Sequence, residues 1–507
     1  MLRIIDTTDH KKRIEFNKDF EKDINRVLSQ YSGNTCVKFA NYKIGDKIYE
    51  KIKFLINDKE QKIQFTVERR LGQGDSMDGE AHAVCIPTFK EEDDPGYCNP
   101  YTKKNVAIKF IPLTIEESKN GPKESKKRSK KPDYGDIKLK TWMELNILYR
   151  LKKLLIDGVS PHFQYIYGHN LCNNTTPNDF DNENITNYYK NQEIITDIVN
   201  KHNEISTMVD SLVDLKIFRN YKSLLVNSMI RDDPIYRQIE FNYDKIMYSN
   251  KSLIIYNELA HYDLSLWFKY AISRSLLNCE TVMSIMFQIL SGINALNSVD
   301  VSHMDLHLGN ILITRVKPGG YWKYSVPDKK GIDRIYYVPN MGYQVKLWDF
   351  GRAIVYDDYP SKKIGSTLIR QVQRFFGDAY GDLFISDIEE SFSNPTETEL
   401  KILKKLTMSF DVFRSMHSIM NVVGKCKKRE GFKELHKVID GIVSEAAIDF
   451  VEKTGKFNSR TKPNGDPISV INRVFKCYKE KKRSCCKKIP GFDSDETIND
   501  TAFIVSY

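Results

Sequence analysis

The residues best suited to chemistry lie in one short segment, HMDLHLGN at residues 303–310, which runs directly into an apolar strand-like stretch. Asp305 and Asn310 are five residues apart on an expected loop, so their side chains can face the same point. A carboxylate can accept or orient a hydroxyl proton, and an amide oxygen can bind a hard cation. A second carboxylate, Asp349, begins the sequence DFG two positions after the last residue of the expected strand 345–347. A carboxylate at the end of a strand is a good Mg²⁺ ligand, so Asn310 and Asp349 are the candidate metal-binding residues.

A lysine and a glutamate far apart in the sequence could each neutralise the buried charge of the other. Lys109 ends the apolar stretch VAIK, so its ammonium must reach an anion or solvent. Glu144 lies on the same apolar stripe as Leu148, Leu151 and Leu155 of an expected helix over residues 136–158, and a carboxylate facing a core is costly unless it is paired. An outward-reaching lysine and a glutamate at the edge of the stripe are the simpler alternatives. We favour a Lys109–Glu144 pair because it removes both unpaired charges.

A glycine-rich turn precedes these residues, with Gly72, Gln73 and Gly74 after a strand-like stretch and Gly79 five residues further on. Glycines let a backbone turn tightly and bring its N–H groups against phosphate oxygens. Met77 fills the usual position of the third glycine, so Gly79 fits only if the turn carries a two-residue insertion. The glycine-rich turn alone is weak evidence for a phosphate-binding loop. The turn, VAIK, HMDLHLGN and DFG in this order, each beside an expected strand, are together very improbable by chance.

In this order the patterns resemble the signature of eukaryotic-type serine/threonine protein kinases: a glycine-rich loop, a strand lysine, a helix glutamate, H-x-D-x-x-x-x-N and DFG. The resemblance covers roughly residues 63–420, and the large inserts make it closest to the divergent kinases of large cytoplasmic DNA viruses. It implies an α+β, bilobal, protein-kinase-like fold, with a small antiparallel β-sheet N-lobe that carries one helix and a larger, mainly helical C-lobe.

The resemblance also implies ATP and Mg²⁺ as cofactors and an activity, transfer of the γ-phosphate to protein hydroxyls. Asp305 would be the catalytic base, Lys109 held by Glu144 would orient the phosphates, and His307 would touch the γ-phosphate. Asn257 would be the gatekeeper beside the hinge. The remaining ATP-binding residues would be Gly72, Gln73, Gly74, Gly79, the backbone of Glu258 and Ala260, and Asp263 at the ribose. Residues 410–413 resemble the buried-aspartate helix that anchors the catalytic loop.

Three departures leave other functions open. Met304 replaces the usual arginine, so activation by a phosphorylated segment is in doubt, and no clear A-P-E sequence follows DFG. His307 stands where a lysine is usual, and the H-x-D-x-H-x-G-N form also resembles small-molecule kinases of the aminoglycoside and choline type. A non-catalytic pseudokinase scaffold is the other alternative, although the lysine and both aspartates are present.

The elements that must position these residues divide the chain unevenly. We expect an N-terminal extension at 1–60 and a strand-rich N-lobe at 61–258, with strands from residue 63 forming an antiparallel meander. The N-lobe would include a basic loop at 114–136 and an Asn-rich insert at 171–250. A helical C-lobe would follow at 259–480, with a Tyr-rich hairpin insert at 315–344, and a basic, Cys-containing tail would occupy 481–507.

Composition sets outer limits on the function. The 507 residues are 41% hydrophobic and 28% charged, with 77 Lys and Arg against 67 Asp and Glu, which is ordinary for a globular protein and only mildly basic. Seven of the thirteen residues at 119–131 are basic, and we expect a solvated loop there, with an acidic partner or nucleic acid as the alternative.

Nine cysteines without a metal-type CxxC pair make a disulfide framework improbable and favour a reducing, cytoplasmic location, in the infected cell or virion if the protein is viral. No segment looks long and apolar enough to span a membrane, because polar side chains interrupt the most apolar stretch, 282–296.

Overall fold

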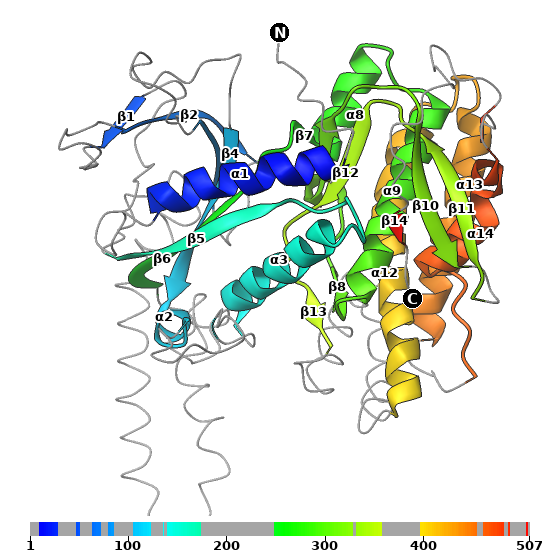
Figure 1. The fold of residues 1–507 in the computed structure, drawn as a ribbon. Coiled ribbons are helices and arrows are strands. Elements are labelled where there is room, and N and C mark those ends of the chain that lie inside the picture. The colour runs from blue at the N-terminus through cyan, green and yellow to red at the C-terminus, as the bar shows by residue number, and fades with distance from the viewer. Residues whose placement is uncertain are drawn as a thin grey trace, which may run out of the picture.

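The computed structural model describes residues 10–28, 47–50, 63–71, 80–85, 105–122, 135, 139–173, 248–327, 331–356, 396–453, 460–480, 485–486 and 503–504. These residues form two lobes, a smaller one built on an antiparallel sheet and a larger one built mainly on helices (Figure 1). The expected α+β, bilobal, protein-kinase-like fold is therefore confirmed.

The N-lobe sheet has six strands in the order β1-β2-β3-β4-β6-β5, and every neighbouring pair is antiparallel. The strands are β1 (Lys47–Glu50), β2 (Ile63–Leu71), β3 (Glu80–Cys85), β4 (Asn105–Thr114), β5 (Ile166–Asn173) and β6 (Tyr248–Glu258). Strands β2, β3 and β4 form the meander that the sequence predicted. Residues 106–113 of β4 are buried inside the sheet, which explains why this stretch is apolar except for Lys109.

Among the described residues, the helices that accompany this sheet are α1 (His10–Leu28), α2 (Ile115–Lys119) and α3 (Lys140–Ile156). Helix α3 buries Leu148, Leu151 and Leu155, the stripe expected from their spacing. Helix α1, from the N-terminal extension, lies against β5 and close to α3 (Figure 1). It buries Ile14, Phe20 and Ile24, so this part of the extension is built into the core of the small lobe.

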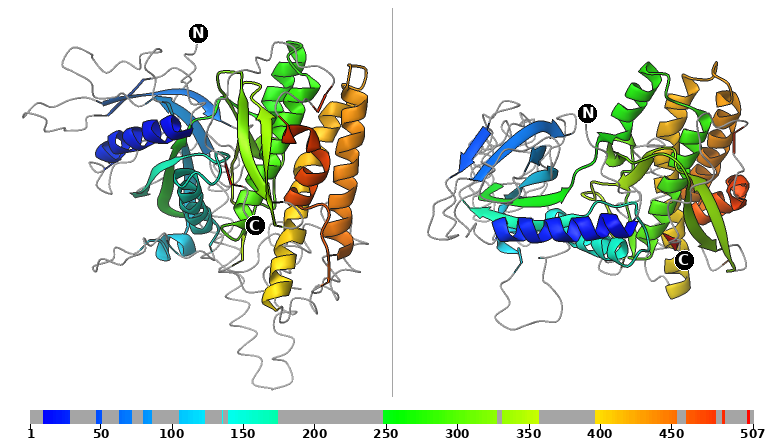
Figure 2. Two further views of the ribbon diagram at one scale, coloured as in Figure 1. Left: turned by 45° about the vertical axis from the view of Figure 1, so that its right-hand side comes forward. Right: turned by 45° about the horizontal axis from the view of Figure 1, so that its top comes forward.

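The C-lobe is organised around helix α9 (Cys279–Asn297), which lies among α8 (Leu264–Ser273), α12 (Glu397–Gly424), α13 (Phe432–Ile448) and α14 (Pro467–Val474) (Figure 2). Contrary to the expectation for residues 282–296, α9 is long and apolar enough to cross a membrane, but 94% of its apolar window is buried inside the lobe. Its central position accounts for the predominantly apolar composition of this helix. Gly292 lets it approach the next layer closely, because an added Cβ would lie 3.0 Å from Leu347 Cδ1.

Two small sheets beside α9 support the loops of the candidate site. Strand β9 (Ile311–Arg315) lies between β12 (Tyr343–Leu347) and β7 (Tyr262–Asp263). Strand β8 (Val301–Ser302) pairs with β13 (Ile354–Val355). The loop 303–310 and the sequence DFG therefore each lie between strands of these two sheets, which fix both ends of each segment.

The predicted insert at 315–344 contains a hairpin of β10 (Tyr321–Pro327) and β11 (Asp333–Pro339). Its aromatic side chains are buried rather than solvated: Tyr324 and Tyr336 both pack against Phe287 of α9. Strand β14 (Phe503–Ile504), close to the end of the chain, pairs in parallel with β10. The hairpin thus extends the core of the large lobe.

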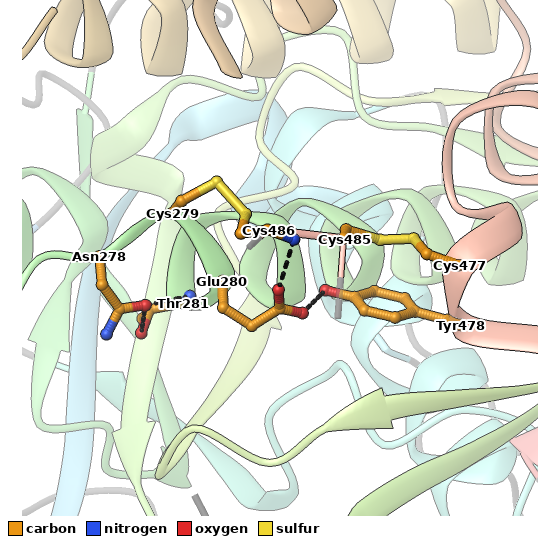
Figure 3. The surroundings of a disulfide bond; sticks show 8 residues. All are labelled: Asn278, Cys279, Glu280, Thr281, Cys477, Tyr478, Cys485 and Cys486. Atoms are coloured by element: carbon orange, nitrogen blue, oxygen red, sulfur yellow. Dashed lines mark hydrogen bonds between the residues drawn. A yellow bond between two sulfur atoms is a disulfide. The ribbon is translucent and has the colours of Figure 1, made fainter. Parts of the chain in front are cut away.

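The expectation that the cysteines would not form disulfides is wrong. Cys279 is joined to Cys486 and Cys477 to Cys485, which ties the tail to the start of α9 (Figure 3). Glu280 lies between the two bonds, where its carboxylate accepts hydrogen bonds from the Tyr478 hydroxyl at 2.5 Å and from the Cys486 backbone at 3.1 Å. Cys279 and Cys486 are 207 residues apart, so only the folding of the tail over α9 brings them together.

His162 lies at the junction of the lobes and is fully buried. Its ring nitrogens bond the Val345 carbonyl and the Tyr324 hydroxyl, each at 3.0 Å, so Nδ1 donates and Nε2 accepts. Burial lowers the pKa of His162 from its usual 6.5 to about 3. The buried ring is therefore neutral in the folded state at neutral pH.

We expect this histidine to make the protein sensitive to acid. Between pH 6.5 and 3 the unfolded chain binds a proton at residue 162 that the folded chain does not, so the free energy of unfolding falls as the pH is lowered through this window. At pH 4 this proton binding lowers the free energy of unfolding by on the order of 3 kcal/mol relative to neutral pH. Urea unfolding from pH 7 to pH 4 should show a shallower pH dependence for His162→Gln than for wild type, even if the variant is less stable at pH 7. Equal slopes would contradict the assignment.

Candidate active site

One ammonium joins the two lobes at the candidate site. Lys109 Nζ, on β4, lies 2.7 Å from Glu144 Oε1 of α3 and 3.2 Å from Asp349 Oδ1 of the DFG sequence. The Lys109 and Glu144 side chains are 7% and 3% exposed, whereas Asp349 is 30% exposed. The predicted lysine–glutamate pair is present, and the same ammonium also contacts Asp349. The more open carboxylate is the one that a cation could reach.

Electrostatics distinguish the two carboxylates that share this lysine. Burial raises the pKa of Glu144, against the opposing effect of Lys109. Burial would also raise the pKa of Asp349, but Lys109 outweighs it and lowers that pKa to about 2. Asp349 has a φ of +65°, in the left-handed region, which is energetically unfavourable for a residue that carries a side chain. Its carboxylate is thus held ionised in a strained turn.

The Asn310 side chain contacts the backbone of Asp305 across the loop. The Asn310 side-chain nitrogen donates to the Asp305 carbonyl at 2.9 Å, which leaves the amide oxygen free to bind a cation. The backbone N–H of Trp348 donates to the Asn310 carbonyl at 3.0 Å. This bond places Asn310 beside the residue that precedes Asp349.

The loop is anchored from below by Asp411, which is fully buried on α12. Its two carboxylate oxygens accept from the backbone N–H groups of His303 at 2.8 Å and Met304 at 2.7 Å. Burial raises the pKa of Asp411 to about 7. Met304 has a φ of +62°, and the two hydrogen bonds hold that strained backbone in place. The anchoring helix inferred from residues 410–413 therefore has the expected position.

Sequence reasoning missed one partner of the candidate base. Arg352 Nη1 lies 3.5 Å from Asp305 Oδ2, and the arginine side chain is 47% exposed while Asp305 is 14% exposed. The arginine directly follows DFG, so its charge was visible in the sequence, but only the turn at Asp349 brings it to Asp305. Met304, which fills the position of the usual arginine, is buried.

His307 makes a local contact. Its Nδ1 accepts from the Gly309 backbone at 3.0 Å and caps a short 3-10 helix, η4 (Leu308–Asn310). Burial lowers the pKa of His307, so its ring is held neutral more readily than a free histidine. Contact of His307 with a phosphate remains a prediction.

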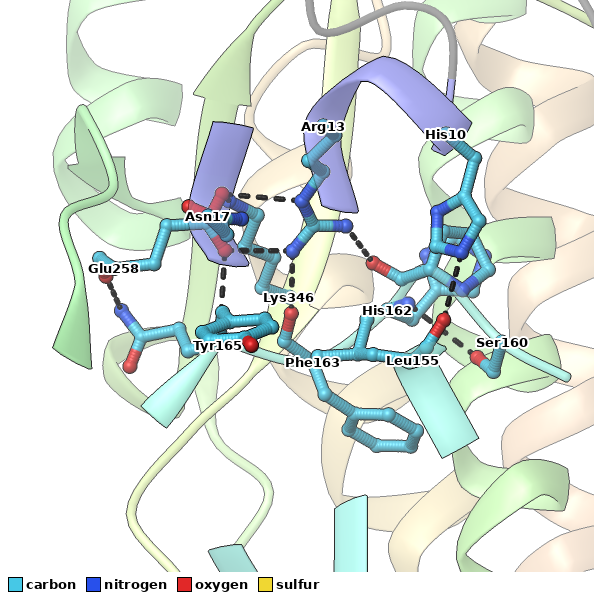
Figure 4. Close-up of polar contacts among 12 residues, drawn as sticks. His10, Arg13, Asn17, Leu155, Ser160, His162, Phe163, Tyr165, Glu258 and Lys346 are labelled. Atoms are coloured by element: carbon cyan, nitrogen blue, oxygen red, sulfur yellow. Dashed lines mark hydrogen bonds and ion pairs between the residues drawn. The ribbon is translucent and has the colours of Figure 1, made fainter. Parts of the chain in front are cut away.

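The segment expected to be the hinge uses its polar groups within the protein. The Glu258 N–H donates to the Tyr165 carbonyl at 2.8 Å, and the Glu258 carbonyl accepts from the Gln164 side chain at 2.8 Å. The Glu258 side chain forms ion pairs with Arg13 and Lys346 (Figure 4). Burial would raise the pKa of Glu258, but the two cations hold it well below its usual value.

The other residues predicted to contact the nucleotide differ in whether their polar groups are available. Ala260 makes no backbone hydrogen bond within the described part of the chain, so its N–H and carbonyl are available. Asp263 caps α8 through a 2.8 Å bond from the Leu266 N–H, and contact with a ribose remains a prediction. Gly72, Gln73, Gly74 and Gly79 lie outside the described residues, as do most of the basic loop at 119–131 and of the Asn-rich insert.

The donor set fits a hard cation that takes most of its ligands from elsewhere. Asn310 and Asp349 present one amide oxygen and one ionised carboxylate, and Mg²⁺ is usually held by one or two protein oxygens together with water and phosphate. Among the described residues, no group of three or more His, Cys, Asp or Glu could hold a metal by itself. The site is therefore suited to a metal that arrives with a phosphate-bearing ligand.

Comparisons with known proteins give a partial sequence match and a weak structural one. Over 73 residues the chain is 42% identical to "Putative serine/threonine-protein kinase 019R" of Frog virus 3 (isolate Goorha), a match that covers 14% of this chain and 8% of that protein. A crystal structure described as a kinase domain aligns over 81% of this chain and 94% of its own, with 13% identity and a TM-score of 0.29, too low to add weight. No family model matches the chain. The chain thus combines a protein-kinase-like fold with a sequence that resembles a divergent kinase of viral type.

Proposed function

We propose that the protein is an ATP-dependent serine/threonine protein kinase that uses Mg²⁺. The observation that carries the proposal is the Lys109 ammonium between Glu144 and Asp349, because it places one cation and one ionised carboxylate side by side where the lobes meet. Phosphoryl transfer requires mainly positioning and charge stabilisation from the protein, and these residues supply both.

Each residue of the site then has a role set by its contacts. Lys109, held by Glu144, binds the α- and β-phosphates. Asn310 and Asp349 hold Mg²⁺, which when bound supplies positive charge to the phosphate oxygens. Asp305 accepts or orients the substrate hydroxyl, and the Arg352 guanidinium lies 3.5 Å from its carboxylate.

A protein substrate is favoured over a small molecule by the resemblance of the hinge and of α9 to protein kinases. The pseudokinase alternative is disfavoured because Lys109, Asp305 and Asp349 are all present, and Lys109 contacts both Glu144 and Asp349. Labelled ATP offered with basic proteins, and separately with aminoglycosides or choline, distinguishes the two classes of substrate.

We expect Lys109→Ala and Asp305→Asn each to lower the rate of phosphoryl transfer by about 10²-fold or more, because each removes a positioned charge. The measurement is transfer of labelled phosphate to a generic protein substrate and to the chain itself. Asp440→Asn, at an exposed position of α13, is the control and should keep the wild-type rate. A wild-type rate in either site variant would refute the assigned roles.

Asn257 offers a second test of nucleotide binding. It is fully buried, and neither its amide nitrogen nor its amide oxygen has a hydrogen-bond partner. It lies directly opposite Ala107 in the β4–β6 ladder, two residues from Lys109, and therefore on the same face of the sheet as Lys109. A buried amide without partners destabilises a protein unless a ligand satisfies it, and the base of a nucleotide held at Lys109 is suited to do so.

We expect Asn257→Val to change stability and binding in opposite directions. Loss of an unsatisfied amide should raise the free energy of unfolding by about 1 kcal/mol, whereas ATP binding should weaken about 3–10-fold, the usual effect of one hydrogen bond. Thermal unfolding and calorimetric titration with Mg·ATP measure the two effects. Asn170→Val, on partly exposed β5, controls for strand propensity. A variant that loses stability and keeps its ATP affinity would show that residue 257 has only a structural role.

A further inference from the structure

We propose that helix α1 is a positioning element of the nucleotide site, in which Arg13 acts through Glu258 on the hinge while His10 and Glu21 hold α3. This inference rests on the proposed function and extends it to a segment outside the region of resemblance. Three parts of the site, namely the hinge, the strand before DFG and the helix that carries Glu144, are each linked to α1 directly or through one side chain.

The first link is a buried arginine. Arg13 is 0% exposed, and its Nε and Nη2 donate to the two Glu258 oxygens at 3.1 and 2.7 Å. Its remaining bonds go to the carbonyls of Pro161 and Phe163, each at 2.7 Å (Figure 4). The two-point geometry fixes the direction of the Glu258 side chain as well as its distance. Arg13 therefore joins α1 to the hinge and to the segment before β5.

The second link runs from Glu258 to β12, the strand that precedes Asp349. Lys346 Nζ on β12 lies 2.8 Å from Glu258 Oε1, and the lysine is fully buried. Lys346 is three residues before Asp349, with β12 ending at Leu347. The cations of Arg13 and Lys346 thus hold one carboxylate between them, and the backbone of the hinge is fixed relative to the strand that leads to DFG.

The third link is to α3. His10 Nε2 bonds the Leu155 carbonyl at 2.8 Å, and Glu21 Oε1 pairs with Lys152 Nζ at 2.5 Å. The other Glu21 oxygen accepts from the Tyr165 hydroxyl at 2.5 Å. Lys152 and Leu155 lie on the helix that carries Glu144, so these contacts limit how far α3 can shift away from Lys109.

These contacts suit a role in positioning more than in stability. A buried ion pair contributes little net stability compared with apolar residues of similar size, although breaking one partner is costly. The apolar residues of α1 already provide burial. Its polar residues Arg13 and Glu21 instead fix where the hinge and α3 lie, because directed hydrogen bonds have one satisfied geometry.

The test uses the full-length chain with Arg13→Met, which keeps an unbranched side chain and removes the charge. Lys18→Met, at an exposed position of the same helix, is the matched control. We expect Arg13→Met to raise KM for ATP about tenfold and to lower kcat, since small displacements of positioned groups are costly in rate. Arg13→Lys should recover part of the loss, because it restores the charge without the two-point contact.

A double-mutant cycle separates positioning from general destabilisation. If Arg13 acts through Glu258, then Arg13→Met should have much less effect on KM when Glu258 is already Gln. Glu21→Gln, which keeps the shape of the side chain, tests the contact with α3 and should lower kcat even if Arg13→Met does not fold. Thermal unfolding of each variant is measured in parallel.

Two results would overturn the inference. One is an Arg13→Met or Glu21→Gln protein with lower thermal stability but KM and kcat within twofold of the control. The other is an equal effect of Arg13→Met with and without Glu258→Gln. A wild-type chain that neither binds Mg·ATP in titration calorimetry nor transfers phosphate would overturn the proposed function and this inference together, which distinguishes that failure from a failure of α1 alone.

Discussion

The shared ammonium of Lys109 is the interaction on which the rest of the site depends. It comes from a buried strand of the small lobe, and its two carboxylate partners come from a helix and from a loop of the large lobe. A charge in this setting is stable only if the partners are held within hydrogen-bonding distance. Helix α3 must therefore stay packed against the sheet, and the DFG turn must stay within hydrogen-bonding distance of Lys109.

The protein meets this requirement with a series of buried polar anchors. Asp411 holds the strained backbone of residues 303 and 304, and Glu258 holds the hinge between two cations. Each anchor joins segments more than eighty residues apart in the chain. Buried polar groups with directed partners select one arrangement among those that apolar packing alone would allow. Helix α1 belongs to this set, which gives an N-terminal segment a part in the geometry of a distant site.

Much of the site could be predicted from the sequence because its signals are local. The spacing of Asp305 and Asn310, the DFG turn after a strand and the buried position of Glu144 each follow from a few neighbouring residues, and the structure brings them together. The partners that were missed are distant in sequence. Arg352 is near Asp305 only because of a strained turn, and Arg13 meets Glu258 across 245 residues. The cysteines were misjudged for the same reason.

The sequence by itself determined the meander of β2, β3 and β4, the stripe of α3 and the residue types able to bind phosphate and metal, since periodicity and short motifs are properties of neighbouring residues. The tertiary structure alone decided which charges are paired, which cysteines are joined, and that α1 and the Tyr-rich hairpin belong to the core. Pairing and burial depend on which surfaces the chain brings into contact, and a single sequence does not encode those contacts in any local pattern.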